Sequence, residues 1–175
     1  MLHQIFILNK KFYEYFKEYN FHKLYRELLN FCSLDLSAFY FDIRKDTLYC
    51  DEIKSHKRQI CINLLSLTLD TLLKWFAPIL SFTTEEIFQI LNKDNNLSIH
   101  LETFPNIPAK WENAKLFQKW DKLKTVRNVV NAAIEVKRAS KEIGSSLEAD
   151  IKVYLDKEYL EVSSGVDLSE YFITS

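Results

Sequence analysis

The stretch NFHKLYRELLNFCSLDLSAFYFDIRKDTLYCD, residues 20–51, repeats apolar residues every three or four positions. That spacing predicts helices, because it places the apolar side chains on one face and the charged side chains on the other. Asn20 is a suitable N-cap for a helix over 21–31, since its side-chain oxygen can accept a hydrogen bond from the first turn. This most distinctive part of the chain therefore predicts a helical fold.

The second half of the stretch predicts another helix. Ser33 or Asp35 is a suitable cap for it. Its expected inward positions are Leu36, Phe39, Tyr40 and Ile43. The polar step at 45–46 then predicts a turn into a short extended segment over 47–49.

Helical periodicity extends to both sides of this stretch. Before it, aromatic residues from Phe12 onward predict a helix that forms a hairpin with the helix over 21–31. After it, Ser55 precedes a long apolar helix that Pro78 ends. The expected buried stripe of that helix contains Ile60, Leu64, Leu67 and Thr71. Residues 92–108 are polar and hold two prolines, which predicts a loop.

The last part of the chain predicts a change of structural class. A long helix is expected over 110–139, and Gly144 ends this segment. Residues 151–155 alternate apolar and polar side chains as a half-buried strand does, and Phe172 with Ile173 offers one more short strand. We therefore expect a mainly α protein: a helical bundle over residues 1–142, followed by the start of a small α/β subdomain over 143–175.

The composition narrows the class of protein further. Of 175 residues, 47% are hydrophobic, which is enough to close a core, while two Gly and three Pro are too few for a many-turned all-β chain. Asp70 and Lys74 interrupt the longest apolar run, so we expect no membrane span. The chain starts without a secretory signal pattern, and its odd cysteine count suits no disulfide framework. These features predict a cytoplasmic protein.

Few residues have the spacing of a catalytic or metal site. The three cysteines form no CxxC pair, so we expect no bound metal. Glu85 and Glu86 resemble paired acid–base carboxylates, but a capping box of Thr83 with Glu86 explains both residues better. The chain contains no phosphate-binding glycine loop, nucleophile elbow or HExxH pair. We therefore expect no catalytic residue in it.

Charge is unevenly distributed, although the net charge is only −1. Residues 110–142 hold nine Lys and Arg against four Asp and Glu, and residues from 143 onward hold two Lys against seven acidic residues. The basic segment can bind phosphates, or it can be a solvated helix face, which composition alone favours. Arg127 lies on the apolar stripe of that helix, where it needs a carboxylate or carbonyl partner, or a ligand. A structural ion pair is the favoured explanation for it.

Four aromatic residues allow two interpretations in the same way. Tyr40, Tyr49, Trp75 and Phe88 can stack on nucleic-acid bases or fill a core. Their helical spacing favours the core.

Three blocks of the chain resemble a known family. The stretch over 20–51, WFAPILSFTTEEIF over 75–88 and VRNVVNAAIEVKRASKEIGSSLEADI over 126–151 are similar to the anticodon-binding helical domain of class Ia aminoacyl-tRNA synthetases, in particular the bacterial-type isoleucyl enzymes. Valyl enzymes carry a Trp-Tyr-containing version of residues 35–40, so the resemblance favours isoleucine. The sequence departs from the family at Thr47, where a basic residue is usual, and at Ser81, where proline is usual.

The resemblance implies recognition of the anticodon stem-loop of isoleucine-accepting tRNA by a domain of a monomeric isoleucine–tRNA ligase. The implied tRNA-binding residues are Arg44, Lys45, Lys122, Lys124, Arg127 and Arg138. The HIGH and KMSKS signatures, which hold ATP in this family, are missing here. ATP and Mg²⁺ would therefore belong to a catalytic domain N-terminal to Met1, and we expect no cofactor in these residues. The alternatives are a helical protein-interaction module, or the same domain of a valyl, leucyl or methionyl enzyme.

Overall fold

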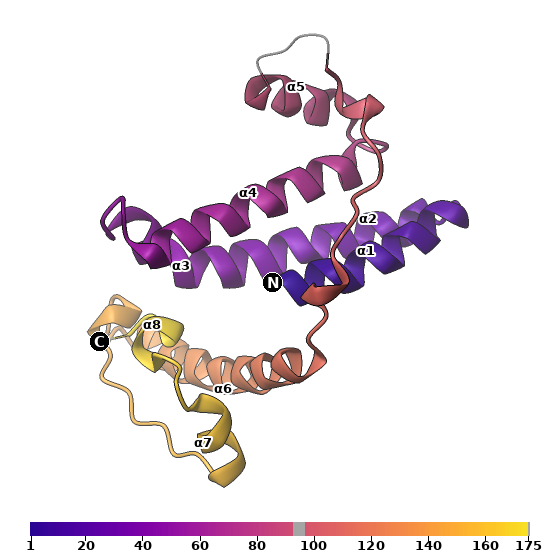
Figure 1. Cartoon of the computed structure of the whole chain (residues 1–175). Coiled ribbons are helices and arrows are strands. Elements are labelled where there is room, and N and C mark those ends of the chain that lie inside the picture. Colours follow the sequence, from indigo (N-terminus) through magenta and orange to yellow (C-terminus); the bar gives the residue numbers. More distant parts are fainter. Residues whose placement is uncertain (93–96, 175) are drawn as a thin grey trace. The chain divides into compact units, whose positions relative to one another are not determined.

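A computed structural model describes residues 1–92 and 97–174 of the chain (Figure 1). The described part is mainly α, as predicted, and it contains no β-strand. Its main helices are α1 (Leu2–Lys17), α2 (Phe21–Asn30), α3 (Asp42–Tyr49), α4 (His56–Phe76), α5 (Ser81–Leu91), α6 (Ala114–Ala139), α7 (Lys157–Ser163) and α8 (Leu168–Phe172).

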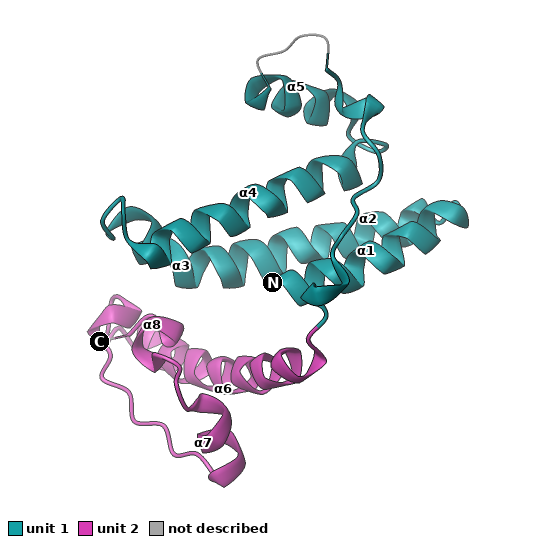
Figure 2. Ribbon diagram, viewed as in Figure 1, with its two compact units in different colours: residues 1–112 teal, residues 113–175 magenta. Residues whose placement is uncertain are grey.

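The chain divides into two compact units (Figure 2). Unit 1 is Met1–Glu112 and unit 2 is Asn113–Ser175. Helix α6 thus belongs with the residues that follow it, and it contacts α7 and α8. The predicted domain division after residue 142 stays a prediction, and each unit is described by itself below.

A helical hairpin of α1 and α2 opens unit 1, as the aromatic spacing predicts. Helix α1 begins at Leu2, well before Phe12, because Ile5 and Leu8 also enter the core. The side chain of Asn20 caps α2 by accepting a hydrogen bond from the backbone N–H of Lys23. This predicted cap is confirmed.

One helix runs without a break from Phe21 to Tyr49 (Figure 1). Its middle is the π-helical segment η1 (Phe31–Phe41), which joins α2 to α3 through right-handed helical backbone at both junctions. The predicted start of a new helix at Ser33 or Asp35 is therefore wrong. The Ser33 hydroxyl instead donates a hydrogen bond back to the Leu29 carbonyl within the helix.

The predicted turn at 45–46 and the extended segment over 47–49 are also wrong, because both lie inside α3. Ile43 and Thr47, four residues apart, are buried on one face of this helix, and α3 packs against α4. Burial of that face therefore outweighs the local turn preference of the polar residues, as tertiary packing often does. The helix ends only at Tyr49.

Helix α4 begins and ends where the sequence predicts. The Ser55 side chain caps its first turn at the Arg58 N–H, and the helix stops at Phe76, two residues before Pro78. The predicted buried stripe is partly wrong, because Ile60 and Leu67 are exposed. The buried residues of α4 are Cys61, Thr68, Thr71, Leu73 and Trp75. The polar threonines tolerate burial because each hydroxyl donates to a carbonyl one turn earlier.

The core of unit 1 surrounds Trp75. Its ring meets Phe12 edge to face, with the ring centroids 4.8 Å apart. The core cluster is Ile5, Leu8, Phe12, Leu24, Leu28, Phe31, Leu36 and Trp75. This cluster holds α1, α2, η1 and α4 together, and the packing of α3 on α4 anchors the far end of the long helix.

Helix α5 begins at Ser81, two residues before the predicted cap at Thr83. The capping box is therefore wrong. The neighbouring Glu85 instead accepts hydrogen bonds from the Ser98 hydroxyl over 2.8 Å and the Ile99 N–H over 3.0 Å, which ties α5 to η2 (Ile99–Leu101).

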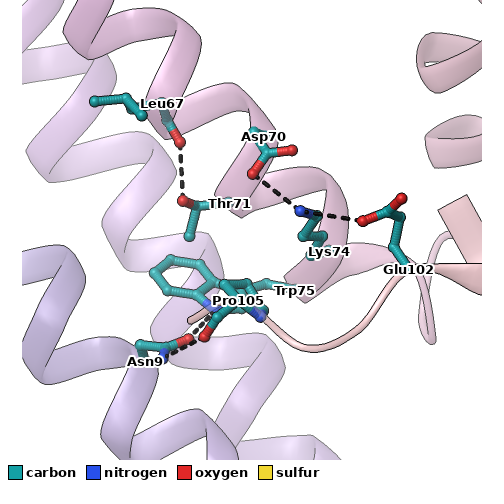
Figure 3. A network of polar contacts seen from close by, with 8 residues as sticks. All are labelled: Asn9, Leu67, Asp70, Thr71, Lys74, Trp75, Glu102 and Pro105. Carbon is teal, nitrogen blue, oxygen red and sulfur yellow. Dashed lines mark hydrogen bonds and ion pairs between the residues drawn. The ribbon is translucent and has the colours of Figure 1, made fainter. Parts of the chain in front are cut away.

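Residues 98–111 form a strap that returns along unit 1 and ends in η3 (Ala109–Trp111), which packs on α1 (Figure 1). Two polar contacts hold it, as Figure 3 shows. Asn9 donates to the Pro105 carbonyl over 2.9 Å, and Lys74 pairs with Glu102 over 3.4 Å. The loop predicted over 92–108 is thus an ordered strap wherever the structure describes it.

Unit 2 consists of α6, α7, α8 and the segments between them. The strand predicted over 151–155 is wrong, because these residues have no regular secondary structure. The strand predicted at Phe172 and Ile173 is wrong because α8 ends there. Asp167 caps α8 and Ile173 adopts the left-handed conformation that ends it. A strand needs a partner to satisfy its backbone groups, and none lies beside 151–155 in the described part of unit 2.

Candidate nucleic-acid interface

A basic surface lies where α3 ends and α4 begins, over residues 44–58, which we call the α3–α4 end. It holds five Lys and Arg against three Asp and Glu. The basic members are Arg44, Lys45, Lys54, Lys57 and Arg58. The three lysines are exposed and the two arginines are half-buried. The surface therefore presents positive charge to solvent on a helix–turn–helix scaffold.

The turn at the α3–α4 end is held by its own hydrogen bonds. The Cys50 N–H donates to the Asp46 carbonyl over 2.8 Å, and the Ser55 N–H donates to the Glu52 carbonyl over 2.9 Å. The Ser55 hydroxyl contacts Asp51 at 3.2 Å. These bonds fix the turn, so the charges around it are presented in a defined arrangement.

The start of α4 adds to the positive character of this surface. The first N–H groups of a helix and its macrodipole both favour anions at the N-terminus. Lys54, His56 and Lys57 flank this start and are exposed. Three sources of attraction for phosphate thus occur within one turn of helix.

The predicted site residues Arg44 and Lys45 both lie at the α3–α4 end. Lys45 pairs with Asp42 over 3.3 Å, but its side chain remains 64% exposed, and an exposed pair of this kind holds a lysine only weakly. Thr47, where the family usually has a basic residue, is buried at this position.

Four further residues of the α3–α4 end were not predicted from the sequence: Lys54, His56, Lys57 and Arg58. The signal was present, because KSHKR over 54–58 is a compact run of basic residues directly around a helix cap. Whether this run joins Arg44 and Lys45 in one basic surface depends on the packing of α4 against α3, which brings them near each other.

The other predicted site residues lie on α6 in unit 2, and several make contacts there. Lys122 bonds Glu158 of α7, and this hydrogen bond raises the pKa of the lysine. Arg138 pairs with Glu135 over 2.8 Å. Lys124, also on α6, is half-buried. Part of the basic helix is thus neutralised by acidic groups of the same unit.

Arg127 is buried inside unit 2. Its guanidinium donates a hydrogen bond to the Tyr171 carbonyl and lies 5.5 Å from the centre of the Tyr171 ring. A carbonyl, one of the partners expected for it, is thus bonded to Arg127, and the favoured ion pair stays a prediction. The assignment of Arg127 to tRNA stays a prediction.

Three of the four aromatic residues singled out in the sequence fill the core of unit 1. Tyr40, Trp75 and Phe88 are at most 7% exposed. Burial raises the pKa of Tyr40, whose hydroxyl lies beside Cys61. Tyr49 differs, because it is 85% exposed at the end of α3.

The described residues contain neither a metal-binding cluster nor a membrane-spanning helix. No group of three or more His, Cys, Asp or Glu side chains is arranged to hold a metal ion in residues 1–92 and 97–174. Within the same residues, no helix has the length and apolar character needed to cross a membrane.

Comparison with known proteins decides the family. The sequence model described as "Anticodon-binding domain of tRNA ligase" matches residues 1–155. The chain belongs to this anticodon-binding domain family. The match includes the α3–α4 end and every helix from α1 through α6 in full.

Relatives of this anticodon-binding domain cover the whole chain. Isoleucine–tRNA ligase of Pelagibacter ubique is 56% identical over 175 residues, and that of Agrobacterium fabrum is 46% identical over 176 residues. That of Mesorhizobium japonicum is 44% identical over 176 residues. In each case all of this chain is matched, but it spans only 18–19% of the relative. The resemblance to aminoacyl-tRNA synthetases is thus confirmed.

Proposed function

We propose that this domain binds the anticodon stem-loop of isoleucine-accepting tRNA as part of an isoleucine–tRNA ligase. The observation that carries the proposal is the α3–α4 end, an exposed basic surface on a turn fixed by hydrogen bonds, in a chain of the anticodon-binding family. Isoleucine is chosen because the relatives are isoleucine–tRNA ligases.

The mechanism is recognition of a single-stranded loop and its flanking phosphates. Lys45, Lys54 and Lys57 supply point charges for phosphate oxygens, and the start of α4 supplies backbone N–H groups and a favourable dipole. Phosphate contacts of this kind position an RNA without reading its sequence. Base identity in a loop is read on splayed, unstacked bases.

The chemistry of aminoacylation belongs elsewhere in the longer enzyme. Binding the anticodon loop here would hold the tRNA so that its acceptor end reaches a separate catalytic domain. ATP and Mg²⁺ would act in that domain, in the cytoplasm. The residues of this chain contribute affinity and orientation.

The proposal is tested by titrating the full chain with isoleucine tRNA at two salt concentrations. We expect affinity to fall steeply as salt rises, because phosphate contacts release counterions. The Lys54→Ala/Lys57→Ala double variant should lose about 1–2 kcal/mol of binding free energy and reduce the salt slope by about two.

The matched control is Lys10→Ala/Lys17→Ala, which removes the same charge from exposed positions on α1. It should change binding much less than the α3–α4 variant. Equal losses in the two variants would mean that only net charge matters. Absence of salt-dependent tRNA binding would favour a protein-interaction module.

A further inference from the structure

Tyr49 is the exposed aromatic residue of the α3–α4 end. Its side chain is 85% exposed, so it contributes little to the core. We propose that one unpaired base of the bound RNA loop stacks on the Tyr49 ring. This inference rests on the proposed function and names the residue that receives a base.

Charge distinguishes Tyr49 from other strongly exposed aromatic residues. Tyr154 is 93% exposed, but Asp150, Asp156 and Glu158 lie close to it in the sequence. Phe82 is 94% exposed, but it precedes Glu85 and Glu86 on α5. Carboxylates repel a phosphate backbone. The α3–α4 end also holds three, Asp46, Asp51 and Glu52, but its five basic residues leave a net positive charge that attracts phosphate.

Tyr19 is 80% exposed as well, but its ring already has an aromatic neighbour. It lies 6.3 Å from the Phe21 ring in an edge-to-face arrangement at the α1–α2 turn. Tyr49 therefore combines exposure with a basic setting.

The position of Tyr49 on α3 suits one nucleotide. Lys45 lies four residues earlier, so the two side chains share a face of the helix, with their Cβ atoms about 5–6 Å apart. Lys45 can hold a phosphate while the ring of Tyr49 receives the attached or neighbouring base. A charge beside a stacking ring is the combination that proteins use for single-stranded nucleic acid.

The turn after Tyr49 makes this platform rigid. The backbone N–H groups of Cys50 and Asp51 both donate to the Asp46 carbonyl, over 2.8 Å and 3.3 Å. Across the turn, the Gln59 amide donates to the Ile53 carbonyl over 2.6 Å. Because the backbone is already ordered, little conformational entropy remains to be lost on binding.

Stacking on Tyr49 should tolerate any base, because each base has a π face. The inference therefore assigns to Tyr49 affinity for an unpaired base, and leaves discrimination between bases to hydrogen-bonding groups. It also implies that the phenolic hydroxyl is dispensable.

The test uses the full chain, isoleucine tRNA, and the variants Tyr49→Ala, Tyr49→Phe and Tyr49→Leu. We expect Tyr49→Ala to weaken binding roughly five- to hundred-fold, Tyr49→Leu to be nearly as weak, and Tyr49→Phe to bind like the parent chain. The salt slope should stay unchanged in all three, because no phosphate contact is lost. Tyr154→Ala is the matched control and should bind normally.

A second arm uses anticodon stem-loop hairpins with one abasic position at a time. The position that stacks on Tyr49 should be the one where removing the base weakens the parent chain but not Tyr49→Ala. Unchanged melting temperatures would show that the variants fold.

The outcomes separate this inference from the proposed function. If the parent chain shows no salt-dependent binding, both fail. If Lys54→Ala/Lys57→Ala weakens binding while Tyr49→Ala does not, the interface stands and the stacking role is overturned. If Tyr49→Phe is as weak as Tyr49→Ala, the ring is not the contact and the inference is likewise overturned.

Discussion

The indole Nε1 of Trp75 donates a hydrogen bond to Oδ1 of Asn9 over 2.9 Å, and this contact joins α4 to α1 inside the core of unit 1 (Figure 3). The amide nitrogen of the same Asn9 donates to the Pro105 carbonyl of the strap over 2.9 Å. One amide side chain thus satisfies two groups from elements far apart in the sequence. The tryptophan that centres the core is oriented by that amide.

Asn9→Leu should destabilise unit 1 by about 1–3 kcal/mol, because it leaves the indole N–H and the Pro105 carbonyl without this partner. Urea denaturation of the full chain, followed by Trp fluorescence, measures the change. Asn30→Leu is the control, since Asn30 is exposed on α2 and its replacement should change stability by less than about 0.5 kcal/mol. Equal effects in the two variants would contradict a role for the Asn9 amide.

Arg127→Ala should destabilise unit 2 by about 2–4 kcal/mol. It removes a charged hydrogen bond to the Tyr171 carbonyl and the packing of a buried side chain. Thermal melting gives the loss, and amide exchange in α8 locates it. Arg138→Ala removes an exposed pair with Glu135 and should change stability by less than about 1 kcal/mol. A stable Arg127→Ala chain with weakened tRNA binding would instead assign Arg127 to the RNA.

Glu85 should make the attachment of η2 to α5 dependent on pH. Hydrogen bonds from Gln89, Ser98 and the Ile99 N–H hold the pKa of its carboxyl below its ordinary value of 4.5. The folded form therefore prefers the carboxylate, so the stabilisation is fully present above pH 4.5 and is lost as the pH falls through the lower folded value.

An NMR titration of the Ile99 amide checks this prediction. We expect its resonance to shift in the acid range below pH 4.5, and to lose that shift in Glu85→Gln. Glu86→Gln, at an exposed neighbouring position, should leave the titration unchanged. A midpoint above 4.5 would contradict the sign of the pKa change.

Lys124→Ala/Arg138→Ala tests the basic helix α6 as a second RNA contact. We expect a loss of roughly 1–2 kcal/mol in binding to isoleucine tRNA and a flatter salt dependence. Binding like that of the parent chain would confine the RNA to the α3–α4 end, if the variants there lose affinity. If neither set of variants changes affinity while the chain stays folded, the strap over residues 98–111 becomes the next surface to test.

Local signals in the sequence located several helix ends correctly. Asn20 and Ser55 cap α2 and α4, and Pro78 follows the end of α4, because each acts through the chain immediately beside it. The cap predicted at Ser33 failed although serine is a good capping residue. Its hydroxyl instead donates to a carbonyl of the preceding turn, because the helix continues through Ser33. Phe31 and Leu36, on either side of Ser33 in this helix, are buried.

Only part of the candidate interface could be predicted from the sequence, because its other part depends on how two helices pack. Arg44 and Lys45 belong to the stretch that carries the family resemblance. Lys54 and Lys57 join them on one surface only because α4 packs on α3. The spacing of the aromatic residues did not show that Tyr40 is buried and Tyr49 exposed. That distinction needed the burial of each ring.

The uninterrupted helix from Phe21 to Tyr49 fixes the direction in which the Tyr49 side chain leaves the helix, relative to the buried residues of the same helix. Buried residues hold the helix from Leu24 to Thr47, and each residue of an α-helix turns the chain by about 100°. An insertion or deletion of one residue between Thr47 and Tyr49 would therefore rotate the Tyr49 ring away from its present direction by roughly a quarter turn or more, while the buried residues up to Thr47 keep their places. The direction of the ring around the helix axis thus depends on the number of residues between it and the core. Substitutions leave this number, and therefore the direction, unchanged.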